Sequence, residues 1–184
     1  MVARHVVEAF GKRPKITAFW DEGNRYSVAI AAATDVPQES ITSYSTVNLS
    51  DWPMYVDGEE YQTRVEIAGA APVEETQFHN AVSTAAFCVI KDKWACMPGA
   101  IFPDVLSMYH ISVTMKHVMF AEPFLWHGLE ESIQLPDRLV TWVMMVPISD
   151  SEYEYAKERG GAALDELLGQ RQVDIFDLQR KPVV

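Results

Sequence analysis

Residues 140–147, VTWVMMVP, place the strongest constraint on the fold of this chain. The run is apolar throughout except at Thr141. Such a run is typical of a β-strand that is covered on both faces, since a half-exposed strand alternates apolar and polar residues. Because Pro147 lacks an N–H group, we expect hydrogen bonding to neighbouring strands to end there. The chain is therefore predicted to bury a strand inside a sheet.

Two short helices are predicted directly after this strand. Ser149 lies three residues before Glu152, which is the spacing of a capping box: each side chain accepts a hydrogen bond from the other residue's backbone N–H. Gly160 is expected to end the first helix in a left-handed conformation. A second helix is expected over 162–168, closed by Gly169. These features predict structure, and none of them is catalytic.

The remaining elements are predicted from their hydrophobic periodicity. Residues 74–91 repeat apolar side chains at helical spacing, with Glu74 and Glu75 expected in the first turn. Residues 111–120 alternate and then become apolar, which predicts a strand entering the core. Also predicted are a helix over 2–10 and strands over 16–20, 26–33, 41–49 and 62–68. Together these elements indicate an α+β fold, with a mixed, largely antiparallel sheet and flanking helices, in a single domain spanning 1–184.

The charge of the chain narrows the class of partner. Fifteen basic residues stand against 26 acidic ones, for a net charge of −11. Nucleic-acid binding is not expected, because phosphate contacts need clustered Lys and Arg. An acidic surface suits a basic protein partner and would speed the encounter by electrostatic steering. Acidity also aids solubility alone, so the charge leaves both interpretations open.

The compartment is predicted from what the sequence contains near its start and from its cysteines. No apolar run approaches the roughly 20 residues of a membrane helix, and residues 1–15 lack the apolar block of a signal peptide. The spacing of Cys88 and Cys96 matches neither a zinc knuckle nor a redox motif. We therefore expect a reduced, cytoplasmic protein that has no membrane contact.

Recognisable catalytic and cofactor motifs are missing from the sequence. There is no Gly-rich phosphate loop, no HExxH, no GxSxG and no EF-hand loop. His110 and His117 lie seven residues apart on a predicted strand, and an odd spacing puts them on opposite faces. We therefore expect no catalytic residue, no metal site and no cofactor, which favours a protein that is not an enzyme.

An alternative class is a small-ligand-binding protein or an enzyme with an unfamiliar pocket. His117, Glu122 and Trp126 are the candidates for lining such a pocket, and they would converge only if Pro123 folds the chain back. A third class is a purely structural component of a larger complex, which would present a large apolar interface. The sequence leaves these alternatives open.

Several segments together resemble the suppressor-of-fused domain family. They are TVNLSDWP (46–53), RVEIAGA (64–70), PGAIFPDV (98–105), HVMFAEPFLW (117–126) and the tail 140–184, which ends in Asp-Leu-x-Arg. The resemblance spans roughly 16–184 and implies an α+β domain that sequesters a protein partner. Bacterial single-domain members of the family are thought to be immunity proteins that neutralise toxins, so a basic toxin domain is the expected partner. The chain has room for only one such domain, and a mechanism in which two domains clamp a ligand is not expected.

Partner contacts are predicted in the polar break around residues 53–62. Asp57-Gly58 marks a turn there, and a half-exposed Trp on a loop is a typical binding anchor, although it is as often a lid over the core. The residues predicted to contact the partner are Asp51, Trp52, Asp57, Glu59 and Glu60. The sequence specifies neither the identity of the partner nor the oligomeric state.

Overall fold

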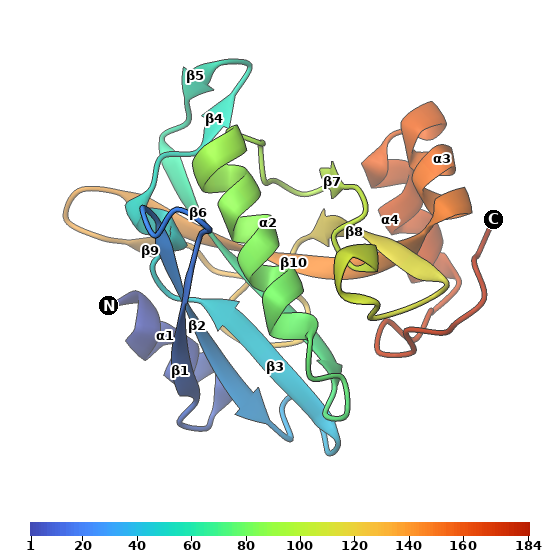
Figure 1. Ribbon diagram of the computed structural model, residues 1–184, viewed down its shortest axis with the longest axis horizontal. Coiled ribbons are helices and arrows are strands. Elements are labelled where there is room, and N and C mark those ends of the chain that lie inside the picture. The colour runs from blue at the N-terminus through green and yellow to red at the C-terminus, as the bar shows by residue number, and fades with distance from the viewer.

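Eight strands form one mixed sheet in the computed structural model, which describes residues 1–184 (Figure 1). In spatial order they are β1 (Lys15–Trp20), β2 (Ser27–Thr34), β3 (Ile41–Thr46), β6 (Thr63–Pro72), β10 (Leu139–Ser149), β8 (Met115–Ala121) and β7 (Ile101–Phe102), with β9 (Ile133–Gln134) paired to β10. Only β6 and β10 pair in parallel; the other neighbours are antiparallel. The predicted α+β class is confirmed.

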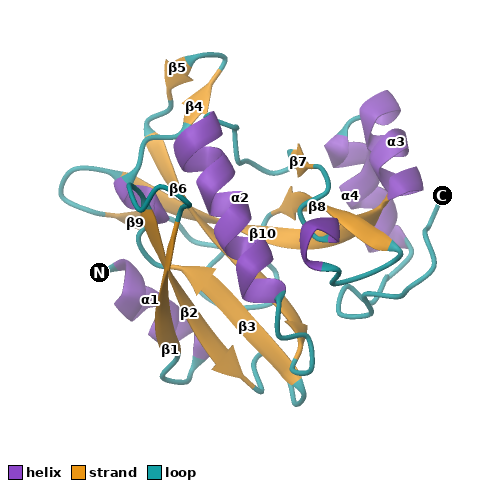
Figure 2. Cartoon of the chain, in the orientation of Figure 1, coloured by secondary structure: helices purple, strands orange, loops and turns teal.

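Helices cover both faces of this sheet (Figure 2). The helix α2 (Phe78–Asp92) packs on one face, and α1 (Val2–Phe10), α3 (Asp150–Arg159) and α4 (Gly161–Gln170) contribute to the core on the other. A separate hairpin, β4 (Tyr55–Val56) and β5 (Glu59–Glu60), stands off the main sheet, and two 3₁₀ turns, η1 (Leu49–Asp51) and η2 (Ser107–Tyr109), lie in the connections. None of the helices has the length and apolar character needed to cross a membrane.

Strand β10 divides its side chains between the two cores. Val143 and Met145 join the core beneath α2, whereas Trp142 and Met144 join the core beneath the other helices. The predicted double-sided burial is confirmed. The prediction that pairing ends at Pro147 was wrong, because Pro147 pairs with β8 and the strand runs on to residue 149. The Pro147 carbonyl points away from β8 and accepts a hydrogen bond from Arg180. The backbone nitrogen of a strand residue points to the same side as its carbonyl, so the lack of an N–H at Pro147 costs no hydrogen bond to β8.

Several predicted boundaries differ from the structure. The strand predicted over 41–49 ends at Thr46, since Leu49 begins the turn η1, and the strand predicted over 62–68 continues to Pro72. Helix α2 begins at Phe78 and not at residue 74, because the Glu75 carboxylate accepts the N–H of Gln77 and closes a turn before the helix. Strand β8 begins at Met115 and not at residue 111, because the hydroxyl of Ser112 accepts the next amides and holds a turn. The last helix continues through Gly169 to Gln170.

The predicted capping box at the start of α3 is confirmed and is part of a larger buried network. The Glu152 carboxylate is fully buried and accepts the Ser149 N–H at 2.9 Å. It also accepts two hydrogen bonds from the Arg180 guanidinium, at 2.6 and 2.9 Å. Burial acts to raise the pKa of Glu152, but these hydrogen bonds and the Arg180 charge outweigh it and lower that pKa. The ion pair ties residues 180–184 to the rest of the fold.

A close backbone contact joins α4 to the loop before β7. A Cβ atom placed on Gly161 would lie 2.0 Å from the carbonyl oxygen of Gly99. Because the obstructing atoms are backbone, no side-chain rotation relieves the overlap. Gly160, just before, has φ of 90° and ψ of 149°, so the chain turns between α3 and α4 in a conformation other than the left-handed helical one that was predicted.

We expect Gly161→Ala to destabilise the protein by about 1–3 kcal/mol or more, because its methyl group forces α4 away from residue 99. Gly169→Ala is the matched control, since nothing lies within 4 Å of its added methyl group and alanine favours a helix by up to about 1 kcal/mol. Urea unfolding of both variants measures the difference. Equal stabilities would show that the backbone contact does not constrain the fold.

Arg180→Met should destabilise the protein by about 3–5 kcal/mol at neutral pH, because it leaves the buried Glu152 carboxylate without its partner. Arg171→Met, at an exposed position, should change stability by about 0.5 kcal/mol or less. Glu152 has a lowered pKa in the folded protein, so its stabilising effect is present above the ordinary glutamate pKa and is lost as pH falls. The difference in unfolding free energy between wild type and Arg180→Met should therefore become smaller as the pH falls toward about 4. A difference that does not change with pH would contradict this role of Arg180.

Candidate functional site

The acidic residues predicted to contact a partner lie mainly on the β4–β5 hairpin, which projects beyond the C-terminal end of α2 (Figure 1). Asp57 occupies the turn with φ of 51°, in the left-handed region that Asp tolerates. The side chains of Asp57, Glu59 and Glu60 are exposed. Glu60 forms an ion pair with Arg64 at 2.6 Å, so Asp57 and Glu59 are the acids of the hairpin that carry no basic partner within 4 Å.

The other two predicted contact residues lie nearby but are used within the fold. Asp51 forms an ion pair with Arg138 at 2.6 Å. Trp52 is half-buried, and its ring meets the Tyr26 ring edge-on at a centroid distance of 5.1 Å. Trp52 therefore packs against Tyr26, at the β1–β2 turn, and its ring lies on the core beneath it. Whether any of these five residues contacts a partner stays a prediction.

A buried carboxylate that the sequence did not single out holds this region in place. Glu66 on β6 accepts the backbone N–H groups of Leu49 at 3.1 Å and Ser50 at 3.0 Å, which fixes the turn η1 just before Trp52. Burial raises the pKa of Glu66, and the hydrogen bond from Thr46 and those from the backbone counteract part of that effect. Glu66 is thus a positioning residue for the surface that carries Asp51 and Trp52.

The residues considered for a ligand pocket are not brought together. His117 is buried on β8, where its Nδ1 accepts the Asp104 N–H at 2.8 Å and its Nε2 therefore donates to Asp150 at 3.0 Å. Trp126 is buried in the core beneath α1, where its Nε1–H donates to the Ser43 hydroxyl at 2.8 Å. Glu122 is exposed. None of the three lines any of the larger cavities. His110 also lies outside β8, so the two histidines do not share a strand.

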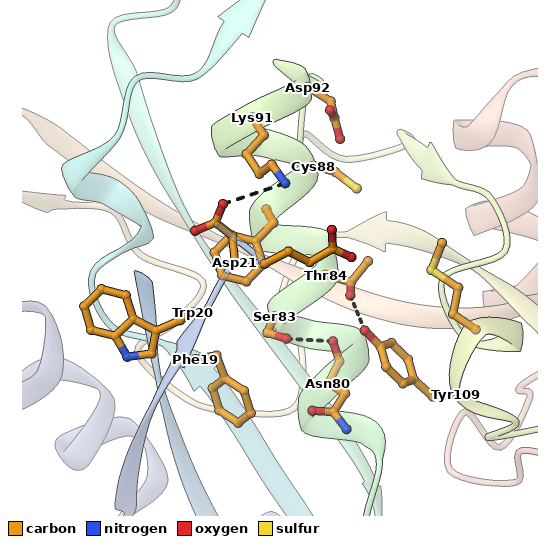
Figure 3. Close-up of a pocket in the computed structure, with 13 residues that line it drawn as sticks. Phe19, Trp20, Asp21, Asn80, Ser83, Thr84, Cys88, Lys91, Asp92 and Tyr109 are labelled. Atoms are coloured by element: carbon orange, nitrogen blue, oxygen red, sulfur yellow. Dashed lines mark hydrogen bonds and ion pairs between the residues drawn. The ribbon is translucent and has the colours of Figure 1, made fainter. Parts of the chain in front are cut away.

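A cavity that the sequence did not predict lies between β1, α2 and η2 (Figure 3). Its volume is about 500 Å³. Four aromatic residues line it, namely Phe19, Trp20, Phe87 and Tyr109, and so does Glu22. Figure 3 shows Asp21 and Asp92 at its upper end, on either side of Lys91. The Thr84 and Tyr109 hydroxyls share a hydrogen bond of 2.6 Å across the wall. The lining comes from three segments far apart in the chain, which explains why no local pattern indicated it.

A second cavity of about 460 Å³ continues along the inner face of β1, lined by Lys15, Thr17 and Phe19 among others. Phe19 lines both cavities, and its ring packs against His79 of α2 at 5.2 Å. The two cavities are neighbours between the edge of the sheet and α2, with Phe19 at their junction, and together they are called the groove. The only local signal for it is that residues 15–20, KITAFW, carry apolar side chains on both faces of one strand.

The electrostatic environment at the upper end of this groove is acidic. Asp21 accepts the backbone N–H groups of Tyr26 and Arg25, at 2.8 and 2.7 Å, and lies 3.9 Å from Lys91. These hydrogen bonds, that from Tyr26 foremost, lower the pKa of Asp21. Glu22 and Asp92 have no basic partner within 4 Å. The C-terminal end of α2 lies here as well, and its carbonyl groups add a partial negative charge.

Comparison with known proteins places the chain in a family. Residues 24–181 match the family model described as Suppressor of fused protein (SUFU). The Immunity protein YqcF of Bacillus subtilis (strain 168) is 41% identical over 184 residues, which is all of this chain and 96% of that protein.

Solved structures of low sequence identity share the fold. A putative suppressor of fused homolog from Neisseria gonorrhoeae FA 1090 superposes with a TM-score of 0.67 at 16% identity, covering 100% of this chain and 94% of that one. The Sufu–Fu complex gives a TM-score of 0.67 at 13% identity, covering 99% and 90%. Drosophila Suppressor of Fused gives 0.63 at 14% identity, and there this chain spans 50% of the larger protein. The family match, the YqcF identity and the shared fold agree: this chain belongs to the suppressor of fused protein family.

Proposed function

We propose that this chain binds a protein partner without catalysing a reaction, and that it acts as an immunity protein that neutralises a toxin by sequestering it. The observation that carries the proposal is the 41% identity to Immunity protein YqcF, which extends over the whole of this chain. Because the match also covers 96% of the relative, the proposal does not depend on one shared domain within otherwise unlike proteins.

The fold and the charge support a basic protein as the partner. One structural neighbour is the Sufu–Fu complex, in which a protein of this fold is held in an assembly with another. The net charge of −11 favours a partner of opposite charge, because complementary potentials accelerate association and disfavour wrong partners. The exposed acids of the β4–β5 hairpin, together with Glu22 and Asp92, are the carboxylates that we propose face it.

The proposal places this activity in the cytoplasm, carried by a single domain. Cys88 and Cys96 are both free thiols, and burial raises the pKa of Cys88 to about 11. A thiol with so high a pKa is scarcely ionised at neutral pH and reacts slowly. Both cysteines therefore fit a packing role in a reducing compartment.

Cells arrested by the cognate toxin should resume growth when this chain is co-expressed. The toxin to test is the product of a gene neighbouring the one that encodes this chain, and an unrelated acidic protein of similar net charge is the control. Growth curves measure rescue, and size-exclusion chromatography of the mixed pure proteins measures the complex. The proposal is wrong if every neighbouring toxin still arrests growth although this chain is soluble and abundant.

Reversing the hairpin charge should weaken the complex. We expect Glu59→Lys combined with Glu60→Lys to lower affinity at least about tenfold, mainly through slower association, because the mutations remove electrostatic attraction at the rim of an interface. Glu158→Lys with Glu166→Lys on α3 and α4 is the matched control, since both residues are exposed and the net charge changes equally. Surface plasmon resonance gives both rates. Equal weakening in the two variants would remove the hairpin from the interface.

A further inference from the structure

Strand β1 leaves one edge of the sheet free. The Asp21 N–H donates to the Tyr26 carbonyl on the β2 side at 3.1 Å, and the Val47 N–H donates to Ala29 from the opposite side of β2 at 2.9 Å. Since hydrogen-bonding direction alternates along a strand, Thr17 and Phe19 bond to β2, opposite Ile30 and Val28. The N–H and C=O groups of residues 16, 18 and 20 therefore point outward, away from the sheet.

The side chains of these same residues are apolar and exposed. Ile16 is 51% exposed and Trp20 is 59% exposed, and Ala18 lies between them. Trp20 is also one of the residues that line the cavity beside α2, and Figure 3 shows its ring projecting from β1 on the side away from that helix. Sheet edges in soluble proteins are normally protected by charges, prolines, bulges or short length. Strand β1 is six residues long, and its only charged residue is Lys15 at its start.

The other face of β1 meets the groove, whose carboxylates all line the cavity at the C-terminal end of α2. Lys15, Thr17 and Phe19 point toward α2 and line the two cavities. Glu22 and Asp92 line the first cavity and carry no basic partner within 4 Å, and the aromatic side chains of Phe19, Phe87 and Tyr109 line the same cavity. A cation in such a site is attracted both by the carboxylates and by the faces of the rings. Met108, 63% exposed, forms an apolar rim on the opposite wall.

We propose that an extended basic segment of the protein partner adds to β1 as a further strand. Its backbone pairs with the outward N–H and C=O groups of residues 16, 18 and 20. Its apolar side chains alternate onto Ile16 and Trp20, and its Lys or Arg side chains reach over β1 toward Glu22 and Asp92. The proposal rests on the proposed protein-binding function and specifies the partner: a segment that alternates apolar and basic residues, drawn by the negative charge of this chain.

The direct test uses a defined probe, the peptide acetyl-TKVRVKT-amide, and the whole chain. Saturating peptide should slow amide hydrogen exchange of Ile16, Ala18 and Trp20 at least about tenfold, because their N–H groups become hydrogen-bonded. Exchange at Thr17 and Phe19, which already bond to β2, should stay unchanged. Heteronuclear NMR measures both sets in one sample. Unchanged exchange at residues 16, 18 and 20, or equal protection by the acidic peptide acetyl-TEVEVET-amide, overturns the proposal.

Two variants separate the backbone and charge contributions. Ala18→Pro removes one outward N–H and leaves the bonds to β2 in place, so it should weaken peptide binding at least about tenfold, whereas Ala18→Val retains the N–H and should bind like wild type. Glu22→Lys with Asp92→Lys keeps the edge but reverses the charge, and should weaken binding to a similar degree. Wild-type affinity in both the proline and the charge variant contradicts the proposal.

Two further outcomes identify a different explanation. If residues 16, 18 and 20 are already protected without peptide, and sedimentation gives a dimer, a second copy of this chain occupies the edge and the proposal fails.

Toxin rescue distinguishes this proposal from the function on which it rests. If wild type rescues cells, and the Ala18→Pro variant and the Glu22→Lys, Asp92→Lys double variant rescue them equally well, the β1 site is rejected and the immunity function is not. If the wild-type chain binds the peptide but rescues cells from no neighbouring toxin, the immunity function is rejected and the β1 site is not.

Discussion

The parallel pairing of β6 with β10 is the contact on which the rest of the fold depends. It joins the antiparallel ribbon β1–β2–β3–β6 to the antiparallel strands β10, β8 and β7. Trp142 stands opposite Glu66 and Val143 opposite Ile67 in its register, so the side chains of β10 enter both cores at once. A slip of one residue in this register would exchange the two faces and bury each side chain in the wrong layer.

The C-terminal segment closes the structure through one buried ion pair. Beyond residue 144, β10 no longer has β6 beside it, and Arg180 occupies that side by donating to the Pro147 carbonyl and to Glu152. Glu152 in turn receives the amides of Ser149 and Val183. A buried guanidinium between a strand and a helix cap is stable only while all of these partners are present, because each lost partner leaves a desolvated charge. This explains why the Asp-Leu-x-Arg ending accompanies the strand and capping box in the sequence.

Local patterns predicted most of the fold, and long-range contacts account for what they missed. The apolar run of β10, the box at Ser149 and the stripe of α2 are properties of neighbouring residues, and each is found in the structure. The role of Pro147 depended on Arg180, 33 residues further along, and no periodicity carries that information. The turn at Asp57 was predictable from its Asp-Gly pair, but the burial of Trp126 depended on Ser43, 83 residues away. The groove beside β1 joins three distant segments for the same reason.

The two edges of the sheet are unlike, and the difference bears on how a chain of this size holds a partner. Strand β7 has only two residues, so it offers little backbone to another chain. Strand β1 offers a six-residue edge, with exposed apolar side chains on one face and, on the other, a groove that carries carboxylates at the C-terminal end of α2. Drosophila Suppressor of Fused is about twice the length that this chain covers. In this structure outward backbone groups, exposed apolar side chains and carboxylates without a basic partner lie together along β1.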